Sequence, residues 1–306
     1  MRIIFMGTPV FAVNSLERLY KDGHDVAAVF TSPDKKKNRG MKLEHSPVKQ
    51  LALLRGTPVY QPQTLKDIKI TEAIKELQCD LIVVVAYGKM LTNEILDIPP
   101  LGAINIHGSI LPKYRGASPV QHAVLNGETE TGVTSMYITE EMDAGDILFI
   151  KKTKIGDDET SLDLFNKLSC LGADLLGETI TAIVQGTAKR IKQDASEATY
   201  APLLRKDMAP IDWNKKAHEI KAHVRGMIPW PVATMQFNGI ILKVFSVNVT
   251  GNSPENPPGT VVSCGKFGIE VSACDYTVLV KEVQAAGGKR MQAADYVRGN
   301  FTSKEM

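Results

Sequence analysis

Leu81-Ile82-Val83-Val84-Val85-Ala86 is an uninterrupted apolar run between polar segments, and it indicates the class of fold to which this chain belongs. A short apolar run bounded by turn-forming residues is typical of a strand buried on both faces of a parallel sheet. Such strands occur in α/β proteins, where helices cover both faces of the sheet. Residues 81–86 are therefore predicted to form the central strand of an α/β domain.

Short strands and helices alternate along the chain before this run. Residues 2–6 and 26–30 are apolar and strand-like, and residues 11–20 between them place their apolar side chains at helical spacing. A helix at 51–54, a strand at 59–60 and a helix around Ile74 continue the alternation. This order predicts an α/β fold with a doubly wound, mainly parallel, Rossmann-like sheet. Ligands bind beyond the carboxyl ends of the strands in such sheets, so the site is expected in the loops that follow them.

The pattern changes from residue 210 onward, where short strand-like segments follow one another. Asn238-Gly239 between two of them is a strong signal for a type I′ hairpin turn. The predicted strands are residues 233–237, 240–247, 261–262, 268–273 and 276–283. Short strands with tight turns predict a small β-barrel, OB-like in kind. We expect a sheet domain over residues 1–189, a linker over 190–207 and the barrel over 208–306.

The composition is that of a folded globular protein, with 43% hydrophobic and 23% charged residues. The formal net charge is only +2, so the molecule as a whole is not a strongly basic nucleic-acid binder. The four cysteines form no CxxC pair and the histidines no H-E-x-x-H motif. Neither a disulfide framework nor a metal site is indicated, and a reducing cytosol is expected. No stretch approaches the ~18 apolar residues of a membrane span.

Gly102-Ala103-Ile104-Asn105-Ile106-His107-Gly108 alternates as a half-buried strand does. Asn105 and His107 therefore point to one face of the strand, opposite Ile104 and Ile106. An amide at this position can donate a hydrogen bond to a developing oxyanion, and an imidazole can move protons near neutral pH. The same pattern is also compatible with a strand that has one polar, half-solvated face and no chemical role.

Asp143 lies in the segment Met142-Asp143-Ala144-Gly145-Asp146, after strand-like residues 133–138. As a functional residue, its carboxylate would orient His107 and stabilise the cationic form of the ring. As a structural residue, it would lie in a solvated turn, because acidic residues and glycine are common there. Three nearby acidic residues compete for the functional role: Glu140, Glu141 and Asp146.

Asn105-x-His107, the following Ser109-Ile110-Leu111-Pro112 and the later Asp143 resemble the pattern of the 10-formyltetrahydrofolate-dependent formyltransferases. The resemblance covers nearly the whole chain and is closest to the members that act on methionyl-tRNA. It extends to Phe5-Met6-Gly7-Thr8-Pro9, residues 84–88, Tyr114-Arg115-Gly116-Ala117, Asp212-Trp213, Arg225-Gly226 and Gly287-Gly288-Lys289-Arg290. One departure is Ile110, where the family pattern Ser-Leu-Leu-Pro has leucine; the exchange conserves volume and apolarity.

The resemblance implies transfer of a formyl group from 10-formyltetrahydrofolate to the amino group of the methionyl moiety of initiator methionyl-tRNA, with Asn105, His107 and Asp143 as catalytic residues. It places the folate along Ser109, Ile110, Leu111 and Pro112, and along Tyr87, Gly88, Met90 and Leu91. The loop before Asp143 would complete the pterin pocket. The resemblance implies no metal. It implies a cytoplasmic translation-initiation enzyme, expected to be a monomer without membrane association, whose C-terminal domain binds tRNA.

Residues 34–45 are a basic segment after the second predicted strand. Its cations are Lys35, Lys36, Lys37, Arg39 and Lys42, against Asp34 and Glu44. A lysine run is often only a solvated face. Beside the expected site it would bind phosphates with an affinity that falls with salt, and the resemblance places this insertion against the tRNA acceptor arm. Further candidates in the C-terminal domain are Lys215, Lys216, Lys289 and Arg290.

Three alternative functions stay open. The first is a formyltransferase for a small amine such as an amino sugar nucleotide, which would not need the basic segment. The second is a formyltetrahydrofolate hydrolase, in which water replaces the amine. The third is a tRNA-recognition module without activity, against which the intact Asn105, His107 and Asp143 argue.

Overall fold

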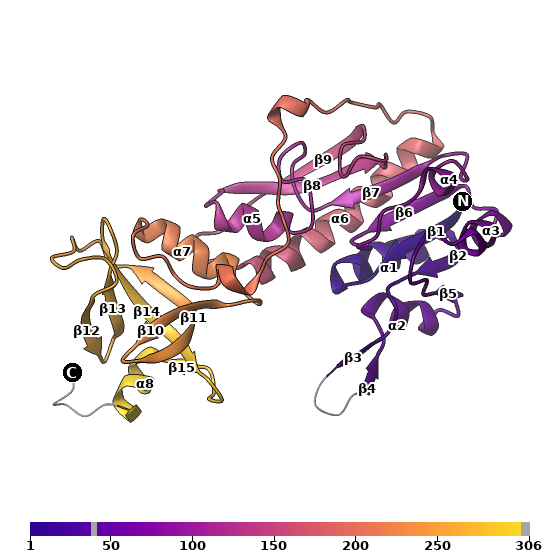
Figure 1. Cartoon of the computed structure of the whole chain (residues 1–306). Helices are drawn as coiled ribbons and strands as arrows, with labels where there is room; N and C mark the ends of the chain where they lie inside the picture. Colours follow the sequence, from indigo (N-terminus) through magenta and orange to yellow (C-terminus); the bar gives the residue numbers. More distant parts are fainter. Residues whose placement is uncertain (38–41, 301–306) are drawn as a thin grey trace. The chain divides into compact units, whose positions relative to one another are not determined.

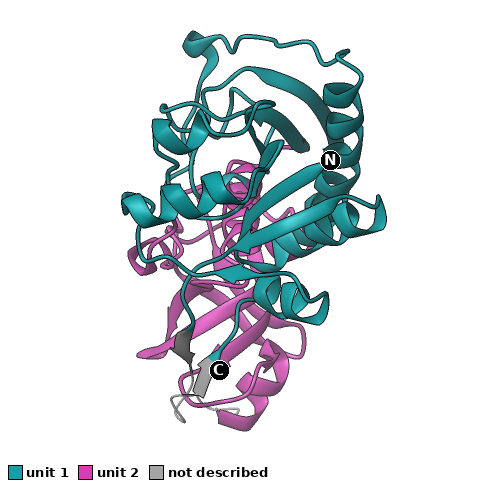
Figure 2. Ribbon diagram, turned by 90° about the vertical axis from the view of Figure 1, so that its right-hand side faces the viewer, with its two compact units in different colours: residues 1–119, 130–154, 165–202 teal, residues 120–129, 155–164, 203–306 magenta. Residues whose placement is uncertain are grey.

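The computed structural model describes residues 1–37 and 42–300, and contacts divide the chain into two units (Figures 1 and 2). Unit 1 comprises residues 1–119, 130–154 and 165–202, and unit 2 comprises residues 120–129, 155–164 and the chain from 203 onward. Helices α5 (Pro119–Leu125) and α6 (Ser161–Val184) contribute residues to both units. Within the described residues, no helix is long and apolar enough to cross a membrane.

Unit 1 is built on a seven-stranded sheet in the order β5-β2-β1-β6-β7-β8-β9. The strands are β1 (Arg2–Gly7), β2 (Asp25–Phe30), β5 (Val59–Tyr60), β6 (Leu81–Val85), β7 (Ala103–His107), β8 (Glu130–Tyr137) and β9 (Ile147–Lys154). Neighbours from β5 to β7 pair in parallel, whereas β8 runs antiparallel to both β7 and β9. The predicted mainly parallel, Rossmann-like sheet is confirmed, and every residue of β6 is buried.

Helices cover both faces of this sheet (Figure 1). They are η1 (Val10–Ala12), α1 (Val13–Lys21), α2 (Pro47–Leu54), α3 (Ile68–Glu76), α4 (Asn93–Leu96) and α6, with η2 (Ala195–Glu197) in the segment after α6. On one face, Val84 and Ala103 share a core cluster with Ile74 of α3 and Ile95 of α4. Each fully buried valine or isoleucine side chain of this cluster contributes about 1.5–3 kcal/mol to folding.

The opposite face of β7 packs against α6. A Cβ atom at Gly172 of α6 would lie 3.0 Å from Cγ2 of Ile106. Thr179 of α6 also bonds Ser135 of β8, with 2.8 Å between the hydroxyl oxygens. Because side chains alternate along a strand, Asn105 and His107 lie on the face that carries Ala103, away from α6.

A two-stranded hairpin follows β2. Its strands are β3 (Lys35–Lys37) and β4 (Lys42–Glu44), which pair antiparallel. At its base, the Asp34 carboxylate accepts hydrogen bonds from Lys49 Nζ at 2.6 Å and from Gln61 Nε2 at 2.8 Å. The hydrogen bond from Lys49 is the main reason that the pKa of Asp34 falls to about 2. These hydrogen bonds hold Asp34, the residue directly before β3, in place.

Unit 2 contains a six-stranded antiparallel sheet in the order β10-β11-β14-β13-β12, with β15 paired to β14. The strands are β10 (Ala233–Phe237), β11 (Ile240–Val249), β12 (Val261–Gly265), β13 (Gly268–Ser272), β14 (Thr277–Ala285) and β15 (Met291–Gln292). The helices are η3 (Lys206–Met208), α7 (Ala217–Gly226) and α8 (Ala293–Asn300). Asn238 and Gly239 have φ of 46° and 77°, as a type I′ turn requires. The predicted C-terminal domain of short strands with tight turns is confirmed, and its strands pair antiparallel.

Candidate active site

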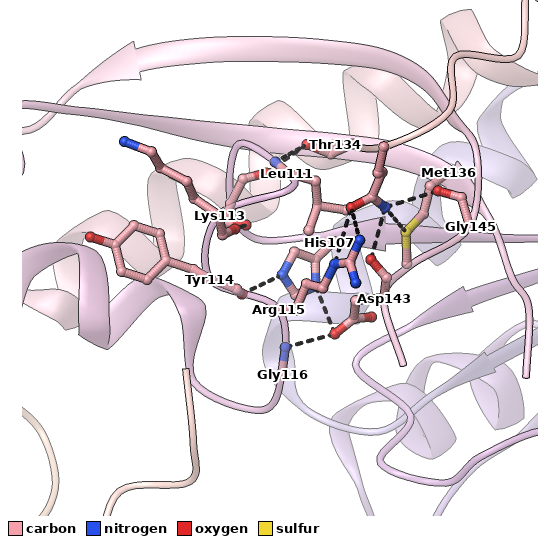
Figure 3. Close-up of polar contacts among 12 residues, drawn as sticks. His107, Leu111, Lys113, Tyr114, Arg115, Gly116, Thr134, Met136, Asp143 and Gly145 are labelled. Carbon is pink, nitrogen blue, oxygen red and sulfur yellow. Dashed lines mark hydrogen bonds and ion pairs between the residues drawn. The ribbon is translucent and has the colours of Figure 1, made fainter. Parts of the chain in front are cut away.

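Asn105 and His107 lie at the carboxyl end of β7, beside β8. Their partners across the antiparallel ladder are Met136 and Thr134. His107 is buried, and its Nε2 lies 2.9 Å from the carbonyl oxygen of Tyr114 (Figure 3). Asn105 is half-buried, and in the described part of the chain its amide has no hydrogen-bond partner. The Asn105 amide is therefore free to bond a ligand.

Asp143 lies in the loop between β8 and β9 and faces the imidazole of His107. Its Oδ2 lies 3.7 Å from His107 Nδ1, a distance within reach of an ion pair but too long for a hydrogen bond. The same oxygen accepts a hydrogen bond of 2.8 Å from the backbone N–H of Gly116 (Figure 3). Both side chains are largely buried, with 6% of His107 and 14% of Asp143 exposed. Burial strengthens the interaction between them.

The contact with Tyr114 decides which imidazole nitrogen exchanges protons. A carbonyl oxygen only accepts hydrogen bonds, so His107 Nε2 carries a proton in both ionisation states of the ring. Nδ1, which faces Asp143, is then the nitrogen that gains or loses a proton. His107 and Asp143 thus present one basic nitrogen and one carboxylate to the same space.

The three acidic competitors of Asp143 have other surroundings. Glu141 is 71% exposed and bonds Arg115 Nη1 at 3.1 Å. Glu140 is exposed. Asp146 is tied to β8 through its backbone, because its carbonyl accepts from the N–H of Tyr137. Among the described carboxylates, Asp143 is the one paired with His107.

The Asp143 loop passes close to the end of β8. A Cβ atom at Gly145 would lie 1.8 Å from the carbonyl oxygen of Tyr137, so no larger residue fits there. Asp143 itself has φ of +52°, in the left-handed region, which costs free energy for residues other than glycine although aspartate tolerates it better than most. Its backbone therefore depends on surrounding contacts to hold this conformation.

The predicted folate residues after β7 form a tightly bonded loop. Ser109 is fully buried, and its hydroxyl donates to the carbonyl of Lys113 at 2.6 Å. Thr134 of β8 donates to the carbonyl of Ser109 at 2.7 Å and accepts from the N–H of Leu111 at 3.1 Å. Leu111 is buried as well, whereas Ile110 and Pro112 are partly exposed. Ser109 and Leu111 thus shape the loop, and Ile110 and Pro112 can contact a ligand.

The predicted folate residues after β6 differ in their exposure to solvent. Tyr87 is 2% exposed, and its hydroxyl has no hydrogen-bond partner among the described residues. Burial raises the pKa of Tyr87 to about 12. Gly88 and Met90 are exposed, whereas Leu91 is buried. Tyr87 thus belongs to the core cluster of this face with one donor that is unpartnered in the described part of the chain, and Gly88 and Met90 are the residues of this set that are exposed.

Four of the five predicted tRNA-contacting residues lie on the β3–β4 hairpin. Lys35, Lys36 and Lys37 make up β3, and Lys42 begins β4. Arg39 lies outside the described residues.

Three groups at the site were not predicted from the sequence. They are the Tyr114 carbonyl, the Gly116 N–H and the Gln193 side chain. Tyr114 and Gly116 belong to a segment that resembles the formyltransferases, which could have drawn attention to them. Gln193 bonds the carbonyls of Asp143 and Gly145 from a segment predicted to be a linker. A single glutamine in a polar stretch carries no local signal of such a contact.

Comparisons with known proteins identify the family of this chain. Residues 1–180 match the formyl transferase family, and residues 203–300 match the formyl transferase C-terminal domain. The methionyl-tRNA formyltransferase of Acetivibrio thermocellus is 46% identical over 301 residues, which cover 98% of this chain and 97% of that protein. That of Clostridioides difficile is 43% identical over 300 residues, with 98% and 97% covered.

Solved structures share the fold at lower identity. An N-formyltransferase from Helicobacter canadensis, in complex with folinic acid and dTDP-3-aminofucose, has a TM-score of 0.70 at 22% identity and covers 92% of this chain and 98% of its own. HypX from Aquifex aeolicus, in complex with tetrahydrofolic acid, has a TM-score of 0.62 at 16% identity and covers 97% of this chain and 47% of its own. Together with the full-length relatives, the matches show that this chain belongs to the formyltransferases, in the methionyl-tRNA formyltransferase family.

Proposed function

We propose that the chain transfers a formyl group from 10-formyltetrahydrofolate to the α-amino group of the methionyl moiety of initiator methionyl-tRNA, in the cytoplasm, for translation initiation. The observation that carries the proposal is the group at the end of β7. A free amide on Asn105 lies on the same strand face as His107, whose Nδ1 is 3.7 Å from the Asp143 carboxylate. In a chain of this family, that group is suited to formyl transfer.

The reaction joins the amine to the formyl carbon and releases the folate nitrogen. The folate supplies an activated formyl group on its N10 atom. A bond forms between the amino nitrogen and the formyl carbon, the bond from that carbon to N10 breaks, and a proton passes from the amine to N10. The α-amino group has a reference pKa of about 7.7, so a useful neutral fraction exists at physiological pH. Positioning and charge stabilisation therefore matter more than deprotonation by a strong base.

Asn105 and His107 have separate roles in this proposal. The Asn105 amide donates a hydrogen bond to the formyl oxygen as negative charge develops on it. His107 takes and returns the proton at Nδ1, because Nε2 is engaged by the Tyr114 carbonyl. Asp143 stabilises the cationic ring from 3.7 Å and keeps its own place through the N–H of Gly116.

We propose that the folate lies along Ser109, Ile110, Leu111 and Pro112 on one side and Tyr87, Gly88, Met90 and Leu91 on the other. The unpaired hydroxyl of Tyr87 supports this assignment, because a buried donor gains most from a ligand acceptor. The parallel pairing of β6 with β7 supports it too, since both segments follow the carboxyl ends of neighbouring strands. No metal is assigned a role.

For the tRNA, we propose that Lys35, Lys36, Lys37, Arg39 and Lys42 contact phosphates of the acceptor arm. The excess of positive charge in the segment and its anchored base at Asp34 support this role. We propose domain limits of 1–189 for the catalytic domain, 190–207 for the linker and 208–306 for the OB-like tRNA-binding domain. A monomer is the proposed functional state.

A formyl-transfer assay with 10-formyltetrahydrofolate tests the proposal. The acceptors are initiator methionyl-tRNA, a dTDP-amino sugar, and buffer alone to detect hydrolysis. We expect formyl-methionyl-tRNA as the main product, with little product from the sugar and little hydrolysis. Activity with the sugar alone, or hydrolysis that the tRNA does not stimulate, would overturn the substrate assignment.

A further inference from the structure

Gln193 makes four hydrogen bonds with nitrogen and oxygen partners through one side-chain amide, and its Nε2 also lies 3.9 Å from Sδ of Met136. Its Nε2 donates to the carbonyl oxygens of Asp143 at 2.8 Å and of Gly145 at 2.9 Å. Its Oε1 accepts from Nε of Arg115 at 3.1 Å and from Nη2 at 2.9 Å. The Gln193 amide thus links Arg115, in the loop after β7, to the loop that carries Asp143. Such a fully used amide can hold two loops in one arrangement.

Arg115 is buried and is held in place by hydrogen bonds of its backbone and side chain. Its side chain is 3% exposed, although an arginine is rarely buried without several acceptors. Its N–H donates to the carbonyl of Thr199 at 2.8 Å, and its carbonyl accepts from the N–H of Ala201 at the same distance. The next residue, Gly116, donates its N–H to the Asp143 carboxylate. The Arg115 segment therefore contacts Asp143 directly through Gly116 and indirectly through Gln193.

The segment that carries Gln193 is itself tied to the sheet. Ile191 and Ile147, at the start of β9, exchange two backbone hydrogen bonds of 2.8 and 2.9 Å. Gln193 lies two residues beyond this bridge, which limits the positions that its side chain can take. The backbone next to Gln193 is therefore fixed relative to β9, and so is the position from which the Gln193 amide reaches the Asp143 loop.

Asp143 needs such support because its backbone has the left-handed conformation, with φ of +52°. For a residue other than glycine, this conformation persists where surrounding contacts determine it. The peptide carbonyls of Asp143 and Gly145 lie on either side of Ala144, and both accept from the same Gln193 amide. One donor group thus fixes the direction of both peptides, and with them the direction of the Asp143 carboxylate.

We propose that Gln193 is a positioning residue for the formyl-transfer reaction, locked by Arg115, and that it holds the Asp143 carboxylate against His107 Nδ1. Residues 191–201 are then part of the active site as well as the connection to unit 2. The inference rests on the proposed role of Asp143 in catalysis. It adds a residue that touches neither substrate and acts through the loop.

Two replacements of Gln193 separate positioning from plain stability. Gln193→Glu keeps an acceptor for Arg115 but loses both donor bonds to the loop, and its charge repels the carbonyls of Asp143 and Gly145. Gln193→Ala loses all four bonds. If Gln193 only supplies a hydrogen-bond acceptor to the buried Arg115, Gln193→Glu keeps the activity of the parent protein. If Gln193 positions Asp143, Gln193→Glu loses activity.

The test measures kcat, KM for both substrates and Tm for the two variants. Gln185→Ala and Gln185→Glu are matched controls, because Gln185 is an exposed glutamine of unit 1. We expect kcat to fall about tenfold to a hundredfold in both Gln193 variants, since a misplacement of about 1 Å can cost that much. KM should stay within about threefold. Tm should fall in both variants, because the carbonyls of Asp143 and Gly145 lose their donor, whereas only Gln193→Glu keeps an acceptor for Arg115.

A double-mutant cycle with Asp143→Asn separates this inference from the proposal on which it rests. If Asp143→Asn alone leaves kcat unchanged, the proposed role of Asp143 fails. If Asp143→Asn lowers kcat as expected, Gln193→Ala should add about twofold or less in that background, because both changes remove one function. A full additional loss in that background, or normal kcat in Gln193→Glu, would overturn the positioning role of Gln193.

Discussion

Asp143 Oδ2 and His107 Nδ1 lie 3.7 Å apart, at the distance of an ion pair without a hydrogen bond. The carboxylate is held there by the N–H of Gly116 and not by the imidazole. Its influence on His107 is therefore mainly that of a negative charge in a site that excludes most water. The remaining gap allows His107 to exchange its proton with a substrate or a bridging water.

Asp143→Asn keeps an oxygen that can accept from Gly116 and removes the negative charge. We expect kcat to fall by about a hundredfold or more, within the range for loss of an acid–base group or its partner. The change in Tm should be small, since the replacement is isosteric. His107→Ala and Asp143→Ala should show losses of the same order while remaining folded. Near-normal turnover, followed by the rate of formyl-methionyl-tRNA formation, would remove the altered residue from the mechanism.

Tyr87→Phe removes a buried hydroxyl that has no protein partner among the described residues. Tm should stay level or rise, because an unpaired buried hydroxyl costs about 1–3 kcal/mol. KM for the folate should rise about threefold to tenfold, the value of one hydrogen bond to the ligand. Steady-state kinetics with varied folate and a thermal melt give both values. An unchanged KM for the folate would exclude the hydroxyl from the pterin pocket.

The strand with Asn105 and His107 could be predicted because its two faces have different surroundings, which gives its sequence an alternating pattern. Ile106 packs against α6, and Asn105 looks to the other side, so the residues alternate between apolar and polar. The run at β6 has no such alternation, because both of its faces are buried. These two patterns, with the Asn238-Gly239 turn, were sufficient for the fold class.

The direction of β8 and the role of Gln193 could not be predicted in the same way. Alternation is the same in parallel and antiparallel strands, so it does not reveal that β8 runs against β7. The bond from Gln193 to the Asp143 carbonyl joins residues 50 positions apart in sequence. The conformation of Asp143 depends on this contact and leaves no periodic pattern.

The basic hairpin should govern affinity for the tRNA and leave the folate site unchanged. Replacing Lys36 and Lys37 by alanine removes two positive charges from β3. We expect KM for methionyl-tRNA to rise several-fold and its dependence on salt to become shallower, by about one unit of log–log slope for each phosphate that is no longer neutralised. KM for the folate should not change. The same replacements at the exposed Lys66 and Lys69 are the control, and equal effects there would show a non-specific charge effect.

Asp34 makes the stability of unit 1 dependent on pH at the base of this hairpin. Its pKa in the folded protein is about 2, held low mainly by the hydrogen bond from Lys49, whereas the pKa of an unfolded aspartate is about 3.9. Its stabilising effect is therefore complete above about pH 4 and is lost as the pH falls toward 2. The Tm difference between the parent protein and Asp34→Asn should be largest near pH 7 and shrink below pH ~4. The exposed Asp97→Asn is the control, and a difference that did not vary with pH would contradict the assignment.

Gly145→Ala tests whether the tight passage of the Asp143 loop beside β8 matters for catalysis. The added methyl group would lie 1.8 Å from the carbonyl oxygen of Tyr137, so the loop must move. Overpacking of this kind costs about 1–3 kcal/mol, less than the ~5–15 kcal/mol that stabilises a typical domain, so the variant should remain folded at 25 °C. Because Asp143 is two residues away, kcat should fall by about tenfold to a hundredfold. Gly265→Ala, where an added methyl group meets no atom within 4 Å, should leave Tm and kcat unchanged. Normal kcat in Gly145→Ala would mean that the Asp143 carboxylate does not need its present position.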